Sequence, residues 1–165
     1  MRSGKRIVLI VAVLIACVGC DQTTKSAAKS YLPETTTWSY LGDTIRLRVV
    51  HNEGGFLSLG ASLPPAWRQW IFLIGAAAAL LALCAYVLFS RSVSTAEVIG
   101  FALLFAGGAG NLVDRALHDG KVVDFINLGI GPLRTGVFNV ADVAVTAAAV
   151  VLLASTLRRR TNSAP

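Results

Sequence analysis

The sequence is poor in charged residues and in cysteine, and each shortage excludes a class of protein. Only 15% of its 165 residues are charged, whereas soluble domains carry charge at about 25% of positions. The three cysteines, Cys17, Cys20 and Cys84, lie within apolar stretches, which argues against a disulfide framework or a spaced zinc site. No Ser-His-Asp or Cys-His arrangement is apparent. We therefore expect neither an ordinary soluble domain nor a metal, a cofactor or a nucleophilic side chain at an active site.

The formal charge of +6 comes largely from basic residues that flank apolar stretches. They cluster near the two ends of the chain, as Arg2, Lys5 and Arg6 and as Arg158, Arg159 and Arg160. A nucleic-acid-binding module would carry a basic stripe with interleaved aromatic residues, so we expect no nucleic acid as a partner. Basic residues beside membrane spans stay on the cytoplasmic side. This rule predicts that both termini are cytoplasmic, and Arg91 in a short connection agrees.

Long apolar runs are what the sequence has in abundance, since 55% of its residues are hydrophobic and its mean hydropathy is +0.65. A helix needs about 20 mostly apolar residues to cross a bilayer. Four stretches meet or approach this length, at about residues 7–28, 68–89, 96–114 and 138–157. We therefore expect an all-α membrane protein, a four-transmembrane-helix bundle that forms a single domain over residues 1–165.

The first apolar run allows two interpretations. Its basic start and the Gly19-Cys20 pair are typical of a cleaved secretory signal that ends at a lipid-modified cysteine. Alternatively the run is a retained span, because no proline or glycine follows Cys20 until Pro33 and a helix can continue between them. Asp21 and Lys25 would then share one helix face and pair, which in isolation fits an ordinary ion pair at the membrane interface.

A polar stretch between the first two spans contains one strand signal. Residues 44–49 alternate polar and apolar side chains, which is the period of a β-strand. The turn-forming residues 52–55 follow, and Trp67 and Trp70 suit the aromatic belt at the start of the second span. A small β-element on the outer side of the membrane is therefore expected.

Two aspartates stand among apolar neighbours near membrane depth. Asp124 lies between Val123 and Phe125, and Asp142 lies at the head of the last span. Acids in such places are costly and are candidates for function. If the two converge, repulsion and desolvation would leave them sharing one proton. An aspartic protease uses such a pair to activate a water and polarise a carbonyl. The alternative is that one acid caps a helix and the other lies in a loop.

The third span ends in small residues followed by polar ones. Residues 106–110 permit close helix packing, and Asn111, Asp114 and Arg115 would then share one helix face. Helix packing and anchoring at the interface explain the glycines. They explain Asn111 less well, because a buried amide must find partners.

Five short motifs follow one another along the chain. They are Asp21-Gln22-x-x-Lys25, Asn52-x-Gly54, Gly108-x-Gly110-Asn111-x-x-Asp114-Arg115, Val123-Asp124-Phe125 and Phe138-Asn139-x-Ala141-Asp142. In this order, attached to four spans, they resemble lipoprotein signal peptidase, also called signal peptidase II. Each motif is weak alone, but together they cover nearly the whole chain. The resemblance favours a retained first span over a cleaved signal.

The resemblance implies an intramembrane aspartyl endopeptidase of the bacterial cytoplasmic membrane. It would remove the signal peptide of diacylglyceryl-modified prolipoproteins by cutting before the lipidated cysteine. Its fold would be a four-helix bundle with a small extracytoplasmic β-cradle, and its active site would face the outer leaflet. The partners expected are a lipid-modified prolipoprotein as substrate and membrane phospholipid, and we expect a monomer.

The resemblance also implies roles for particular residues. Asp124 and Asp142 match the catalytic pair. The substrate groove would be lined by Asn52, Gly108, Asn111, Arg115, Asn139 and Ala141. Supporting roles fall to Asp21, Lys25 and Asp114.

One segment departs from the family pattern, and two other functions stay open at this point. The sequence reads Gly55-Phe56-Leu57-Ser58 where the family commonly has Ala-Ala-Phe-Ser, so the shape of the outer cradle is open there. A small proton-coupled carrier or channel subunit could also use membrane-embedded carboxylates to relay protons. A lipoprotein anchored through Cys20 would instead lose its first segment and carry lipid.

Overall fold

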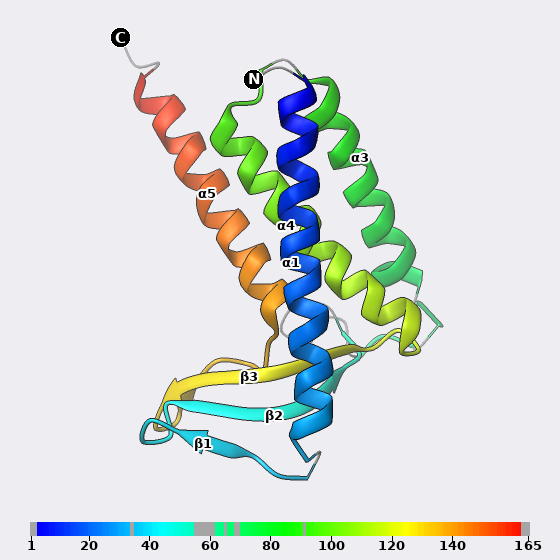
Figure 1. The fold of residues 1–165 in the computed structure, drawn as a ribbon, viewed down its shortest axis with the longest axis vertical. Coiled ribbons are helices and arrows are strands. Elements are labelled where there is room, and N and C mark those ends of the chain that lie inside the picture. Colours follow the sequence, from blue (N-terminus) through cyan, green and yellow to red (C-terminus); the bar gives the residue numbers. More distant parts are fainter. Residues whose placement is uncertain are drawn as a thin grey trace.

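The structure is a computed structural model that describes residues 3–33, 35–54, 62–64, 66–67, 70–90 and 92–162. Within these residues four helical stretches are long and apolar enough to cross a membrane. They are α1 (Ser3–Tyr31), the π-helical turn η2 (Trp70–Gly75) continued by α3 (Ala76–Phe89), α4 (Thr95–Leu117) and α5 (Val140–Asn162). The start of α1 and the end of α5 lie at one end of the bundle, and a small sheet lies at the other (Figure 1). The predicted fold class is confirmed.

The bounds of the helices follow local sequence signals. α1 runs unbroken past Cys20 and ends shortly before Pro33, as predicted for a retained span. α4 begins with a capping box in which the Ser94 N–H donates to Glu97 Oε2 (2.7 Å) and the Glu97 N–H donates to Ser94 Oγ (3.3 Å). These signals place the starts and ends of the helices without reference to tertiary contacts.

One of the basic residues that flank the first span is buried against α3. The side chain of Arg6 is only 6% exposed, and its Nη1 donates to the carbonyl oxygens of Val87 and Ser90, at 2.7 Å each. Carbonyls at a helix C-terminus lack partners within the helix and attract a cation. Arg6 therefore caps α3 and ties it to α1.

Close packing of α4 against α5 and α1 depends on glycine. A methyl group on Gly107 would lie 2.7 Å from Val145 Cγ2 and would collide with the Ala141 carbonyl oxygen. A methyl group on Gly110 would lie 2.7 Å from Asp21 Oδ2. The close helix approach predicted for residues 106–110 is confirmed. It brings the start of α5 and the polar end of α1 close to α4.

We expect Gly107→Ala to lower the stability of the bundle by about 1–3 kcal/mol, the usual effect of overpacking a tight contact. Gly19→Ala is the matched control, because nothing lies within 4 Å of a Cβ at that position. Alanine there should stabilise the helix slightly. Apparent Tm values in one detergent separate the two variants, and equal values would contradict the packing argument.

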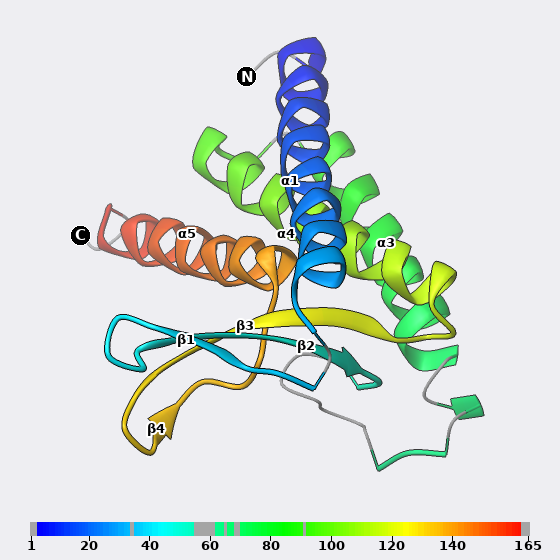
Figure 2. The same cartoon turned by 60° about the horizontal axis from the view of Figure 1, so that its bottom comes forward.

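A four-stranded antiparallel sheet covers the end of the bundle opposite the start of α1 (Figure 2). Its order is β1 (Trp38–Tyr40), β2 (Ile45–Asn52), β3 (Val122–Ile130) and β4 (Leu133–Arg134). The strand predicted at residues 44–49 falls in β2, whereas β3 was not predicted as a strand. An irregularity in β2 between Leu47 and Val50 shifts the register, so that Val50 pairs with Asp124.

The sheet is attached to α1 by a small apolar cluster. Its buried members are Ala28, Leu32, Val49, Val123 and Phe125. They join the last turn of α1 to the neighbouring strands β2 and β3. This contact fixes β3 under the bundle, where a residue of β3 can reach the ends of α4 and α5.

Candidate active site

Asp124 lies within β3, and its side chain is only 2% exposed. Asn52, the last residue of β2, donates from Nδ2 to Asp124 Oδ2 at 2.9 Å. Asn52 is held in turn by its Oδ1, which accepts the Gly54 N–H at 2.9 Å in a local turn. The strand pairing and this turn together orient one side of the Asp124 carboxylate.

Asp142 is the third residue of α5 and takes part in the cap of that helix. The N-cap residue Asn139 accepts the Asp142 N–H on Oδ1 (3.0 Å), and Asp142 Oδ2 accepts the Asn139 N–H (3.2 Å). This reciprocal pair is a capping box with an aspartate in place of the usual glutamate. Asn111 of α4 donates from Nδ2 to Asp142 Oδ1 at 3.1 Å. The helix start therefore fixes the half-buried Asp142 carboxylate.

One buried asparagine contacts both acids. Asn139 is fully buried and donates from Nδ2 to Asp124 Oδ1 at 2.7 Å, while its Oδ1 accepts the Asp142 N–H. The four carboxylate oxygens of the two aspartates each accept one N–H from an asparagine. Because a carboxylate offers about four acceptor sites, capacity remains for a water and a substrate. The structure thus brings Asp124 and Asp142 together from different elements.

The electrostatics of the pair favour retention of a proton. The pKa of Asp124 is raised from 3.8 to about 6, mainly by burial and in addition by the nearby charge of Asp142. Hydrogen bonds from Asn52 and Asn139 and the charge of Lys25 oppose the rise. Since the raising effects dominate, the Asp124 carboxyl holds its proton to a higher pH than an exposed aspartate does.

We expect Asp124→Asn to remove a pH dependence of stability. A carboxyl whose pKa is about 6 when folded and 3.8 when exposed stabilises the fold at low pH and loses this contribution as pH rises through 6. The shift corresponds to about 3 kcal/mol. The Tm of Asp124→Asn, relative to wild type, should therefore rise between about pH 4 and about pH 8 in the same detergent. A relative Tm that stays constant over this range would contradict the assignment.

Behind the pair lies a buried ion cluster made of Asp21, Lys25 and Asp114. The Lys25 side chain is 2% exposed, and its Nζ lies 2.7 Å from Asp21 Oδ2 and 3.0 Å from Asp114 Oδ2. Its Nζ also donates to Asn111 Oδ1 at 3.1 Å. Gln22 donates to Asp114 Oδ1 at 2.9 Å. Ions so deeply buried persist only when they are paired, and here two carboxylates share one ammonium.

Arg115 joins α4 to the segment after β2. Its Nη2 donates to the Gly54 carbonyl oxygen at 2.8 Å, and its guanidinium lies 5.5 Å from the centre of the Phe72 ring. A cation over an aromatic face is stabilised by the ring electrons. Arg115 therefore holds the turn that orients Asn52 in its place beside the pair.

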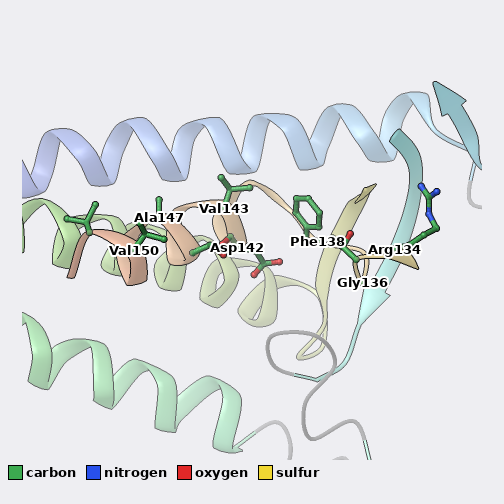
Figure 3. A pocket seen from close by; sticks show the side chains of 10 residues that line it. Arg134, Gly136, Phe138, Asp142, Val143, Ala147 and Val150 are labelled. Atoms are coloured by element: carbon green, nitrogen blue, oxygen red, sulfur yellow. Dashed lines mark hydrogen bonds between the residues drawn. The ribbon is translucent and has the colours of Figure 1, made fainter. Parts of the chain in front are cut away.

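A cavity of about 790 Å³ opens beside Asp142 on the side of α5 (Figure 3). Its lining follows α5 with Asp142, Val143, Thr146, Ala147, Val150 and Val151. It continues toward the sheet with Phe138, Gly136, Thr135 and Arg134. Most of this lining is apolar, whereas Asp142 and Arg134 are charged, so the cavity suits a ligand with a long apolar part and a polar group.

The structure places most of the predicted site residues around Asp124 and Asp142. Two of them, Ala141 and Gly108, are placed differently from the prediction. Ala141 takes part through its backbone N–H, which donates to Asp21 Oδ1 at 2.9 Å. Gly108 is turned away from the pair, since a methyl group there would lie 2.6 Å from Leu80 of α3. Its predicted place in the substrate groove stays a prediction. The departure at residues 55–58 lies outside the described residues.

The sequence predicted no role for Arg134 or for the α5 residues of the cavity other than Asp142. Nothing in the sequence marks Thr146 or Ala147, because an apolar span looks alike on its lipid face and its cavity face. Gln22 was part of a motif but received no role, although it contacts both Asp21 and Asp114. Over the part of the chain that the structure describes, no three His, Cys, Asp or Glu side chains are placed to hold a metal ion.

Comparisons with known sequences point in one direction. The family model of signal peptidase (SPase) II matches residues 13–158. The chain is 34% identical to the lipoprotein signal peptidase of Bifidobacterium adolescentis over 86% of this chain and 72% of the relative. It is also 34% identical to the lipoprotein signal peptidase of Desulforapulum autotrophicum, over 92% of this chain and 91% of the relative.

Comparisons with solved structures agree with the fold. One bacterial membrane enzyme superposes with a TM-score of 0.78 at 24% identity, covering 98% of this chain and 92% of that enzyme. A second bacterial membrane enzyme superposes with a TM-score of 0.73 at 25% identity, covering 93% of both chains. The helices and the sheet therefore have the arrangement of membrane enzymes over nearly their full length.

Proposed function

This chain belongs to the signal peptidase II family, aspartic peptidases that remove signal peptides from prolipoproteins, and we propose that Asp124 and Asp142 are its catalytic pair. The single observation that carries the proposal is the placement of Asn139, which hydrogen-bonds to the Asp124 carboxylate and to the backbone of Asp142. A carboxylate pair held around one residue beside a cavity is an arrangement that suits acid–base hydrolysis.

The proposed reaction needs only the two carboxyl groups and one water. The ionised carboxylate takes a proton from the water while the water oxygen attacks the scissile carbonyl carbon. The protonated carboxyl donates its proton to the carbonyl oxygen, which gives a neutral tetrahedral diol. When the C–N bond breaks, the carboxyl that took the water's proton gives it to the leaving amine, and the other carboxylate takes a proton from a diol hydroxyl, so the pair is again singly protonated. The raised pKa of Asp124 supports a proton being held near neutral pH.

The cavity beside Asp142 is the proposed entry for the lipid-modified substrate. Its apolar α5 lining would face the region that a membrane-anchored acyl chain occupies, and Asp142 lies partway along it, between the rest of the α5 lining and the residues toward the sheet. Asn52, Asn111, Arg115 and Asn139 would shape the groove around the pair, whereas Gly108 and Ala141 would act through helix packing and the backbone. The cut would then fall just before the lipid-bearing cysteine.

The proposed topology is one membrane unit over residues 1–165 with both termini in the cytoplasm. The start of α1 and the end of α5 lie at the same end of the bundle, away from the sheet (Figure 1). Basic residues at that end, including Lys5 and Arg158, support a cytoplasmic location. The sheet and the pair would then lie toward the outer leaflet, in a monomer surrounded by phospholipid.

The function is tested with the purified protein and a diacylglyceryl-modified precursor peptide in detergent. We expect a product that begins with the lipidated cysteine, identified by mass spectrometry, and much slower cleavage of the same peptide without lipid. A chelator should leave the rate unchanged, because two carboxyls and a water suffice for the proposed chemistry. Absence of cleavage by folded protein, or its loss on addition of chelator, would contradict the proposal.

We expect Ala147→Trp to weaken substrate binding, because an indole there fills the cavity beside Asp142. KM for the lipid-modified peptide should rise by about tenfold or more with kcat little changed, since an apolar contact made in ground and transition states alike is lost. Ala154→Trp is the matched control, as Ala154 is an exposed alanine on the same helix that does not line the cavity. Equal KM values for the two variants would place the substrate elsewhere.

A further inference from the structure

The buried ion cluster holds more carboxylate than a simple ion pair requires. Lys25 alone would be neutralised by one acid, but both Asp21 and Asp114 contact it, and each is 1% exposed. All three N–H groups of the ammonium are used, the third by Asn111 Oδ1. A second buried carboxylate is costly, so its position calls for a further role.

Each carboxylate of the cluster also accepts one backbone N–H. Asp21 Oδ1 accepts the N–H of Ala141 at 2.9 Å. Asp114 Oδ2 accepts the N–H of Val123 at 2.9 Å. Ala141 immediately precedes Asp142, and Val123 immediately precedes Asp124. The two acids of the cluster therefore hold the backbone directly before each member of the pair.

Lys25 is the common point of both attachments. Its Nζ contacts Asp21, which holds the start of α5, and Asp114, which holds β3. The third contact leads to Asn111, whose Nδ2 donates to Asp142 Oδ1 at 3.1 Å. One ammonium on α1 thus links the three elements that carry the site, which are α4, α5 and β3.

We propose that Asp21 and Asp114, joined through Lys25, are positioning residues that set the separation between the carboxylates of Asp124 and Asp142. The proposal rests on the proposed function of the pair. Its physical basis is the steep dependence of catalysis on geometry, because a displacement of about 1 Å can lower a rate by about 100-fold. A link through charged hydrogen bonds resists such displacement better than apolar contacts do.

Substitutions of Asp114 can either keep or remove the hydrogen bond that it accepts from the Val123 N–H. In Asp114→Asn the amide oxygen can still accept the Val123 N–H and contact Lys25, which both meet the same oxygen in the wild type. The amide nitrogen would face Gln22, whose side chain can turn its oxygen toward it. Asp114→Leu has nearly the same shape and no acceptor. In both variants Lys25 remains paired with Asp21, so the cluster keeps a neutral pair.

The experiment compares kcat and KM for the lipid-modified peptide at equal amounts of folded protein. Asp114→Leu and Asp21→Leu should each lower kcat by about 30-fold or more with KM changed by less than about threefold, because positioning acts on the transition state. Asp114→Asn should stay within about fivefold of wild type. Lys29→Met replaces an exposed lysine one turn further along α1 and touches neither backbone hydrogen bond, so it should leave kcat nearly unchanged.

The pH profile separates positioning from mere stability. If the carboxylates move apart, Asp142 raises the pKa of Asp124 less, so the alkaline limb of kcat/KM shifts to lower pH. The charged groups near Asp124 that the substitution leaves in place are Lys25 on α1, Arg115 on α4 and Asp142 on α5. A role in stability alone would change the folded fraction and leave this limb where Asp114→Asn, which removes the same charge, places it.

A second variant covers the case in which Asp114→Leu fails to fold. Asp114→Glu keeps the charge next to Lys25 but moves the acceptor by one methylene, so it should fold and lower kcat by about tenfold or more. Wild-type kcat in folded Asp114→Glu and Asp21→Leu, or equal losses in Asp114→Asn and Asp114→Leu, would overturn the positioning role. The proposed function fails by a different result, namely normal cleavage by Asp124→Asn or Asp142→Asn.

Discussion

Replacing Lys25 with methionine is expected to destabilise the protein by about 3–5 kcal/mol, the usual cost of leaving buried charge without its partner. Methionine is of similar length and keeps the apolar stem, but it removes the ammonium from between Asp21 and Asp114. Both carboxylates are 1% exposed, so water cannot replace the lost cation. The loss is measured as a fall in apparent Tm and in the yield of folded protein from membranes.

A neighbouring lysine supplies the control for this prediction. Lys29 lies one turn further along α1, is exposed and contacts His118 Nε2 at 3.2 Å. Lys29→Met should change stability by no more than about 0.5 kcal/mol. Neutralising both acids as Asp21→Asn and Asp114→Asn should restore part of the stability lost in Lys25→Met, since an uncharged buried set avoids the desolvation cost. If Lys25→Met were as stable as Lys29→Met, the buried ion cluster would not hold the fold.

Asp124→Asn and Asp142→Asn should each lower kcat for the lipid-modified peptide by about 100-fold to 10,000-fold, the range for loss of a general acid or base. An amide can neither take a proton from the water nor return one to the leaving group, so either substitution stops the same cycle. The double variant should therefore be hardly slower than either single variant, because the two groups act as a unit.

Asp119→Asn is the matched control for the catalytic pair. Asp119 is an exposed acid that adopts a left-handed backbone conformation with φ +53°, which asparagine tolerates. The Asp119→Asn variant should cleave the peptide at the wild-type rate. The comparison is made at equal amounts of folded protein, so that partial unfolding of a variant does not lower its measured rate. If Asp124→Asn or Asp142→Asn cleaved as fast as Asp119→Asn, the substituted aspartate would have no catalytic role.

The helices were predictable from the sequence because their signals are local. Apolar length located all four spans, and the absence of a breaker before Pro33 predicted that α1 continues past Cys20. The alternation in residues 44–49 located β2, in which Arg48 is exposed and its neighbour Val49 is buried. These features depend on neighbouring residues alone.

Strand β3 was missed for a physical reason. Its first four residues, from Val122 to Phe125, are all buried, and the strand contacts both α1 and α4. A strand buried on both faces shows no alternation and cannot be told from other apolar runs. Asp124 could therefore be predicted as a candidate for function, while the strand that positions it could not.

The contacts within the site depend on residues far apart in the sequence. The pairing of Asp21 with Lys25 follows from their spacing on one helix, but the contact of Lys25 with Asp114 joins α1 to α4. Likewise nothing in the local sequence links Asn52 to Asp124. The resemblance to a family identified these residues as a set, and only the structure assigns each hydrogen bond to its partner.

The central claim is that the carboxylates of Asp124 and Asp142 act on one water and one scissile carbonyl. It is tested most directly by an experimental structure with a lipid-modified substrate analogue in which a tetrahedral hydroxyl carbon replaces the scissile amide. We predict that the hydroxyl oxygen lies within about 2.6–3.2 Å of one oxygen from each carboxylate. A hydroxyl bound to one aspartate alone, with the other too distant for even a bridging water, would contradict it.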